Sequence, residues 1–411
     1  MRGLALLGIF IMNMPGFASS FHAPEPVEQA RRQAESAPDA AVSMLAGLLL
    51  EGKFNGLFTL LFGLGLALQL SRLEAPRSLG IHAGVGIVVR RLLALWAFGL
   101  AHAVLLWGGD VLHIYAVLGL GLLMVRRWSD KALLALASGL LLAQFAHSIV
   151  MAWLWSPERH AIEQAFLTEL HARDETVYGH GPWWDGVLLR AQSFALRYSA
   201  AQLLGPQSWF WLALATTAVL GLWAHRAGWL NANRTAGRWL ASATGLRALL
   251  GLWLFSAGLW LLAAQLGTGP EPGEAPRTVH LWAWALQDTH RVLMVLSYAG
   301  LTLRWCQGPE DSGLRRLLAE VGRMPLTCYL LQSLMGTFIF HAWGLGFWGE
   351  MGRTAQTALA VLLFATVQVP LAHLWLSRHA QGPAEAMWRW LSYGRTSALG
   401  KAQIDRNPSD R

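Results

Sequence analysis

The sequence predicts an all-α protein, a polytopic bundle of transmembrane helices. Of its 411 residues, 54% are hydrophobic and only 14% are charged, and the mean hydropathy is +0.37. This composition is too apolar for a soluble protein with an ordinary surface. Apolar runs of about 20 residues, the length that crosses a bilayer, recur along the chain. We therefore expect an integral membrane protein that contacts the lipid bilayer.

The apolar runs can be placed by their length. About ten of them are long enough to span a membrane. They cover residues 3–19, 45–70, 84–107, 110–126, 132–155, 206–226, 246–266, 281–303, 325–345 and 355–377. Together they define a membrane domain over residues 1–380, and residues 381–411 follow as a polar tail. The long segment 156–205 carries charges of both signs, so we expect it to hold interfacial helices on the extracytoplasmic side.

Basic residues fall in alternate connections between the runs, and this pattern sets their orientation. In chain order they are Arg72, Arg77, Arg90 and Arg91; Arg126, Arg127 and Lys131; Arg226, Arg234, Arg238 and Arg247; and Arg304, Arg315, Arg316 and Arg323. The positive-inside rule assigns these connections to the cytosol, so both termini are expected there. The net charge of +8 then reflects topology, and nucleic acid is not expected as a partner.

Tryptophan, cysteine and the first residues add further constraints. Many of the 22 tryptophans lie near run ends, where amphipathic rings favour the headgroup region. Cys306 and Cys328 lack a metal-ligand spacing such as C-x-x-C, so we expect neither a disulfide nor a metal site. Residues 1–22 also fit an alternative, a cleavable signal peptide, because a basic residue precedes a short apolar run that ends in small residues.

The strongest candidate site lies in the segment AHAVLLWGGDVLHIYAVLG, across the third and fourth runs. It places His102, Asp110, His113 and Tyr115 among apolar residues. An ionisable side chain in hydrocarbon costs ~2.5 to 3.5 kcal/mol on insertion scales, so this grouping indicates a functional site. His102 is a candidate general base for an acceptor hydroxyl or amine, and Asp110 either orients it or holds the acceptor. The alternatives are a packing histidine and an aspartate that caps the fourth helix.

Other polar residues within the apolar runs are candidates for substrate contacts. Asp288 and Arg291 are spaced to pair on one helix face, where they either neutralise each other or line a pathway. Gln332 and His341 either polarise a substrate carbonyl oxygen or hydrogen-bond between helices.

Five segments resemble, in this order, the YeiB family of bacterial membrane proteins. They are MRGLALLGIFIMNMPGFA, KFNGLFTLLFGLGLAL, HAVLLWGGDVLHIYAVLGLGLL, GRMPLTCYLLQSL and GPAEAMWRWLSYG. The family has no settled activity. The resemblance implies a multi-pass protein of the bacterial inner membrane. It also implies a first span that begins upstream of Met1, because relatives start before the R-G pair.

The YeiB family is similar in turn to transmembrane acyltransferases, among them bacterial O-acetyltransferases and the lysosomal heparan-glucosaminide N-acetyltransferase. The bacterial enzymes carry a first-helix histidine where this chain has Asn13. The lysosomal enzyme carries its essential histidine in the following loop, where this chain offers His22. By this resemblance Arg2 and Asn13 position the acyl donor, and His22 joins His102 and Asp110 as a catalytic candidate.

The resemblance implies acyl-CoA as a co-substrate and no bound cofactor. Its phosphates would dock on the basic inner face, where Arg323 and Arg389 are the candidates for binding them. The leading hypothesis is an acyltransferase that moves an acyl group from acyl-CoA to an extracytoplasmic glycan or lipid. The alternatives are a proton-coupled transporter or channel, and a non-catalytic membrane subunit.

Overall fold

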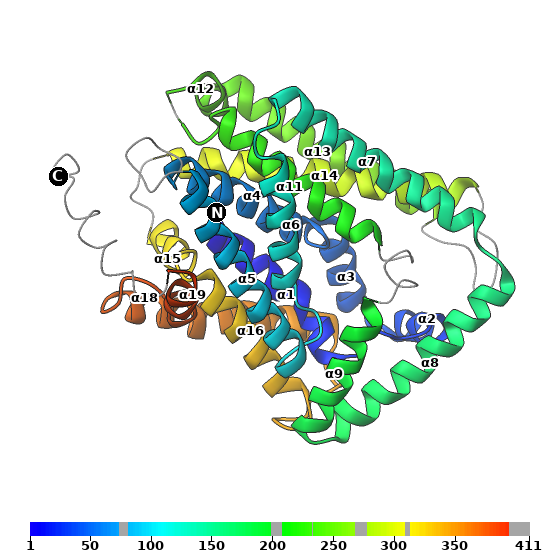
Figure 1. Cartoon of the computed structure of the whole chain (residues 1–411). Helices are drawn as coiled ribbons and strands as arrows, with labels where there is room; N and C mark the ends of the chain where they lie inside the picture. Colours follow the sequence, from blue (N-terminus) through cyan, green and yellow to red (C-terminus); the bar gives the residue numbers. More distant parts are fainter. Residues whose placement is uncertain (74–80, 199–207, 232, 268–277, 309–312, 394–411) are drawn as a thin grey trace.

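The computed structural model describes residues 1–73, 81–198, 208–231, 233–267, 278–308 and 313–393, and these residues form an all-helical protein (Figure 1). The helices are α1 (Arg2–Ala18), α2 (Glu25–Ala34), α3 (Ala37–Leu49), α4 (Lys53–Leu73), α5 (Ile81–Leu105), α6 (Leu112–Val125), α7 (Asp130–Trp153), α8 (Pro157–His180), α9 (Trp183–Arg197), α11 (Ser208–Arg226), α12 (Thr235–Ala241), α13 (Ala243–Leu266), α14 (Thr278–Gln307), α15 (Gly313–Val321), α16 (Pro325–Phe340), α17 (Arg353–Leu363), the π-helical turn η1 (Phe364–Gln368), α18 (Val369–Leu376) and α19 (Pro383–Tyr393). The predicted all-α class is confirmed.

Five helical stretches in the described part of the chain are long and apolar enough to cross a membrane. They are Ala37–Leu73, Gly84–Leu105, Asp130–Met151, Ala243–Leu266 and Arg353–Leu376. Three shorter apolar helices, α1, α6 and α16, coincide with further predicted runs, as do α11 and α14. Residues 206–207 of one predicted run, 199–205 of the predicted interfacial segment and 394–411 of the predicted tail lie outside the described residues. The membrane character of the protein therefore rests on several independent helices.

Helix α1 lies inside the bundle, and its apolar side chains are among the most buried in the protein. Leu6, Phe10, Met14 and Phe17 are fully enclosed. The helix packs against α4, α15, α16 and α17, so it is the element around which the other helices gather (Figure 1). An apolar helix surrounded by other helices is expected to be hydrophobic on all sides, as this sequence is.

Small residues let two of the long helices approach closely. Gly63 on α4 faces Ala218 on α11, and Gly221 on α11 faces Leu60 on α4. A Cβ atom at either glycine would lie 2.1 Å from the carbonyl oxygen opposite. These positions therefore have to be glycine for the two helix backbones to meet, which is the usual role of small residues between membrane helices.

Helices α5 and α6 form a hairpin whose turn is held from two sides. On one side, the indole N–H of Trp107 donates to the carbonyl oxygen of Gly16 on α1, at 2.9 Å. On the other side, Arg190 on α9 donates to the carbonyl oxygens of Val104 at 2.8 Å and Leu105 at 3.1 Å. Those carbonyls are at the carboxyl end of α5, where they have no partner within the helix. Hydrogen bonds from α9 and to α1 therefore hold the turn in place, and the candidate site lies in this turn.

Candidate functional site

Asp110 lies buried in the α5–α6 turn and joins two histidines. Its Oδ1 is 2.8 Å from Nδ1 of His102, and its Oδ2 is 2.5 Å from Nδ1 of His113. The backbone N–H of His113 also donates to Oδ2, at 3.1 Å, so Asp110 holds the first turn of α6 as well. All three side chains are at most 3% exposed. The structure thus brings together three residues that the sequence singled out.

The second ring nitrogen of each histidine contacts a hydroxyl group. Nε2 of His102 is 2.8 Å from Oγ of Ser333 on α16, and Nε2 of His113 bonds to the hydroxyl of Tyr198, just beyond α9. A carboxylate only accepts hydrogen bonds, so each histidine donates to Asp110 from Nδ1 and accepts from its hydroxyl at Nε2. Burial raises the pKa of Tyr198 to about 12, so this hydroxyl keeps its proton at neutral pH.

The chain Ser333–His102–Asp110 has the connectivity of an activated nucleophile. A hydroxyl lies against a base, and the base is oriented by a carboxylate. Sequence reasoning missed Ser333, because one serine in an apolar helix is ordinary; the one available signal was its position beside Gln332 in GRMPLTCYLLQSL. Within the described residues, no group of three histidine, cysteine or acidic side chains has a geometry that would hold a metal ion.

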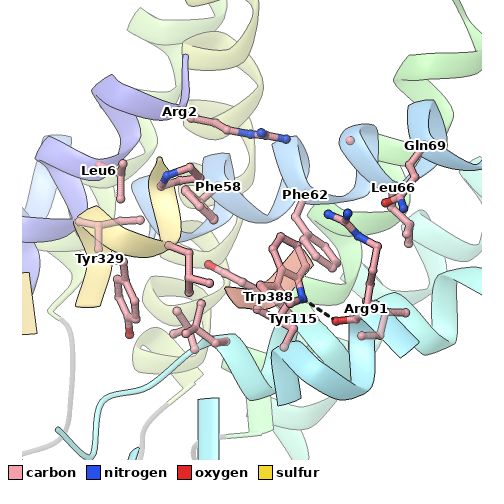
Figure 2. A pocket seen from close by; sticks show the side chains of 18 of the residues that line it. Arg2, Leu6, Phe58, Phe62, Leu66, Gln69, Arg91, Tyr115, Tyr329 and Trp388 are labelled. Atoms are coloured by element: carbon pink, nitrogen blue, oxygen red, sulfur yellow. Dashed lines mark hydrogen bonds between the residues drawn. The ribbon is translucent and has the colours of Figure 1, made fainter. Parts of the chain in front are cut away.

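A cavity of about 170 Å³ lies beside this cluster, among α1, α4, α5, α6, α16 and α19 (Figure 2). Its middle is apolar and aromatic, formed in part by Phe58 and Phe62 of α4, which both stack on Tyr115. Arg2 and Arg91 also line it. Two further predicted site residues, Arg2 and Tyr115, therefore line one cavity. This cavity is separate from the cluster around Asp110.

Tyr329 separates the cavity from the buried cluster. It lines the cavity, and its ring centroid lies 4.9 Å from that of His102. It is one helical turn before Ser333 on α16. The cavity therefore ends one side chain away from the candidate base.

Several predicted site residues lie elsewhere. Asn13 is half-buried on α1 and does not line the cavity. Nδ1 of His22 donates to Oδ2 of Asp174 on α8, at 2.9 Å, and His22 is not hydrogen-bonded to the cluster around Asp110. Arg323 donates to the carbonyl oxygen of Ala380 at 3.3 Å.

Arg389, the second candidate for binding acyl-CoA phosphates, also lies away from the cavity. Its guanidinium lies 5.9 Å from the ring centroid of Tyr393, and it does not line the cavity. Trp388, its neighbour in the sequence, does line it. The residue of this segment that reaches the cavity is therefore aromatic and not basic.

The remaining candidates have partners of their own. Arg291 donates to Asp288 at 2.7 Å, which is the pair that their spacing predicts. Gln332 donates to the carbonyl oxygen of Leu6 at 3.1 Å and to Oε1 of Gln368 at 2.9 Å, so it joins α16 to α1 and η1. His341 is buried just after α16, with its ring 4.6 Å from that of Tyr178.

Comparison with known proteins agrees with the motifs. Residues 224–395 match the model of a family described as a protein of unknown function, DUF418. The uncharacterized protein YxaH of Bacillus subtilis (strain 168) is 26% identical over 413 residues, which cover 96% of this chain and 92% of YxaH. The uncharacterized protein YeiB of Escherichia coli (strain K12) is 25% identical over 403 residues, which cover 95% of this chain and 94% of YeiB. The predicted resemblance to YeiB-type proteins is confirmed. No solved structure matches the chain.

The similarity to the two relatives extends over nearly the whole chain. Their alignments cover 96% and 95% of it. The family model covers α16 and α19, which contribute Ser333 and Trp388. Neither the family description nor the names of the two relatives state an activity.

Proposed function

We propose that this YeiB-type protein is a multi-pass acyltransferase of the bacterial inner membrane, with about ten spans and both termini in the cytosol. It transfers an acyl group from acyl-CoA to a glycan or lipid acceptor on the extracytoplasmic side. The observation that carries this proposal is the hydrogen-bonded chain from Ser333 through His102 to Asp110. In this arrangement His102 is held as a neutral base, with Nε2 facing a hydroxyl.

The distribution of arginines supports this orientation. Arg304 on α14 donates to the carbonyl oxygens of Leu240 and Ser242, Arg226 at the end of α11 donates to that of Trp128, and Arg315 on α15 donates to that of Trp305. Helices α12, α15 and α19 lie at one end of the bundle (Figure 1), and the positive-inside rule assigns that end to the cytosol. Helices α8 and α9 lie at the opposite end, beside the turn that carries Asp110 (Figure 1).

The proposed reaction uses His102 in both directions. Nε2 of His102 takes the proton of a hydroxyl as its oxygen attacks the carbonyl carbon of the thioester. The carbon–sulfur bond then breaks, and the leaving thiolate receives that proton from His102. Asp110 stabilises the imidazolium in between and keeps the ring in the required tautomer. Such proton transfer contributes roughly a hundredfold to ten-thousandfold in rate.

Turnover of acetyl-CoA by purified protein in lipid nanodiscs tests this proposal. We expect saturable release of CoA from the wild type and a loss of roughly a hundredfold or more in His102→Ala. His180→Ala is the matched control, because His180 is exposed at the end of α8. Equal release from all three proteins, or none from the wild type with any glycan, lipid or amine acceptor, would overturn acyl transfer.

A second candidate function is proton-coupled transport. The observation that favours it is that the hydrogen-bonded chain continues from Asp110 through His113 to Tyr198, beside α9. A continuous series of titratable groups is typical of proton relays in membrane proteins. Proton uptake into vesicles that contain the protein, abolished in His113→Ala while CoA release is absent, would favour transport over acyl transfer.

A further inference from the structure

Two arginines face the same end of the cavity, and neither has a carboxylate partner among the described residues. The guanidinium of Arg91 is close enough to Arg2 to repel it. Figure 2 shows both guanidinium groups, with Gln69 beside Arg91. Nε2 of Gln69 is buried and makes no hydrogen bond. Donors from Arg2, Arg91 and Gln69 thus gather at this end of the cavity, and the acceptor given for Arg91 is a neutral one, the hydroxyl of Tyr393 at 3.5 Å.

Arg91 is held in position by α19. Its guanidinium lies 4.2 Å from the ring centroid of Trp388, and the indole N–H of Trp388 donates to the carbonyl oxygen of Arg91 at 2.8 Å (Figure 2). One N–H group of Arg91 donates to the hydroxyl of Tyr393 at 3.5 Å. A stacked guanidinium can direct its remaining in-plane N–H groups at a planar or tetrahedral anion.

Glu385, three residues before Trp388 in the sequence, hydrogen-bonds to α16 and not to the two arginines. Glu385 on α19 accepts hydrogen bonds from the backbone N–H groups of Leu326 and Thr327, at 2.6 and 3.2 Å, and from the hydroxyl of Thr327 at 2.5 Å. It caps the amino end of α16 and does not neutralise Arg2 or Arg91. Glu385 is thus not the charge partner of either arginine, and a bound anion would supply one.

Beyond the arginines the cavity is narrow and apolar. Its lining there includes Leu66, Leu92 and Leu95, together with Tyr115 and Tyr329. A cavity with donors at one end and an apolar interior fits a ligand that has an anionic head and one slender chain. Phosphate is the head that two guanidinium groups and an amide bind best, since it offers several charged oxygens.

We propose that this cavity binds a phosphate-headed molecule with a single slender chain, with the phosphate between Arg2 and Arg91 and the chain extending toward Tyr329. Two sources have this chemistry: the phosphates and pantetheine arm of a CoA thioester, and a lysophospholipid. The first source rests on the proposed function, because it places the thioester carbonyl near His102. The binding site itself does not depend on catalysis.

Gly65 offers a way to fill the cavity without disturbing the fold. It lines the cavity, and a Cβ atom at Gly65 would meet only the flexible end of the Arg2 side chain, at 2.8 Å. Gly65→Leu therefore puts a side chain into the space proposed for the ligand. Gly121→Leu on α6 is the matched control, because it is exposed and has no atom within 4 Å of the added Cβ.

Binding of acetyl-CoA and of lysophosphatidic acid to the protein in nanodiscs tests the proposal, with octanoate and inorganic phosphate as probes of the chain and the head alone. We expect one or both phosphate-headed molecules to bind, each more tightly than octanoate or phosphate. Gly65→Leu and Arg91→Gln should each weaken binding by about tenfold or more. Gly121→Leu and Arg173→Gln, which removes an exposed arginine on α8, should leave it unchanged.

The outcomes separate this proposal from the proposed function. Binding of lysophosphatidic acid alone would support the cavity site and remove acyl-CoA as the donor. Binding of acetyl-CoA without turnover would support the site and overturn acyl transfer. If neither phosphate-headed molecule binds, or if Gly65→Leu and Arg91→Gln bind them like the wild type, the cavity site is refuted.

Discussion

Gly99 on α5 packs directly against the backbone of His113 on α6. A Cβ atom at Gly99 would lie 2.3 Å from the backbone nitrogen of His113 and 2.8 Å from Oδ2 of Asp110. This close approach brings the carboxylate of Asp110 within reach of histidines on both helices. The absence of a side chain at Gly99 is thus a condition for the cluster.

We expect Gly99→Ala to destabilise the protein by about 1 to 3 kcal/mol, because the new methyl group overlaps backbone atoms that cannot move freely. Gly86→Ala on the same helix is the control, since its Cβ would have nothing within 4 Å. Alanine there should leave stability equal or slightly raised, because it is the better helix former. Thermal unfolding followed by tryptophan fluorescence measures both. Equal melting temperatures for the two variants would contradict the close approach.

Asp110→Asn should impair both stability and turnover. An asparagine amide can accept from one histidine only, so the other loses its partner and the tautomer of His102 is no longer fixed. Removing one partner of a buried charged cluster costs about 3 kcal/mol. We expect CoA release to fall roughly a hundredfold. Asp185→Asn, at an exposed position on α9, is the control for both measurements. A fully active Asp110→Asn protein would exclude His102 as a base oriented by Asp110.

Ser333→Ala tests whether the serine itself receives the acyl group. The distance of 2.8 Å between its Oγ and His102 Nε2 is that of a nucleophile and its base. We expect CoA release to fall roughly a hundredfold or more, and intact-protein mass spectrometry to find an acyl adduct on the wild type that the variant lacks. Thr337→Val, one turn farther along α16, is the control. Unchanged turnover in Ser333→Ala would instead make the acceptor hydroxyl the direct partner of His102.

Alkaline pH should loosen the layer formed by α8 and α9. Burial raises the pKa of Tyr178 from 10.0 to about 12. Between these values the tyrosine of the unfolded chain releases its proton first. The contribution of Tyr178 to stability is therefore constant below pH 10 and falls as the pH rises toward 12. The loss is on the order of 2 kcal/mol. Unfolding midpoints across this range should fall less steeply in Tyr178→Phe than in the wild type. Parallel slopes in the two proteins would show that Tyr178 does not titrate there.

The helices could be predicted from the sequence because membrane-length apolar runs have one dominant conformation. The grouping of His102, Asp110 and His113 could also be predicted, since their spacing around the turn between two helices puts them at a similar depth in the bundle. The roles of Ser333 and Arg91 could not be predicted from the sequence. A serine in an apolar helix and an arginine at the end of a run each have an ordinary explanation, and only the packing of α16 and α19 against α5 gives them another.

The cavity is built from helices far apart in the sequence, since Arg2 stands on α1 and Trp388 on α19. During synthesis α1 enters the membrane long before α19 leaves the ribosome, so a growing chain holds one arginine of the pair without the wall that positions the other. A ligand pocket of this kind forms only after α19 has been made. Chains that stop before α19 would be inserted in the bilayer yet unable to capture a ligand, which links binding competence to the synthesis of that helix.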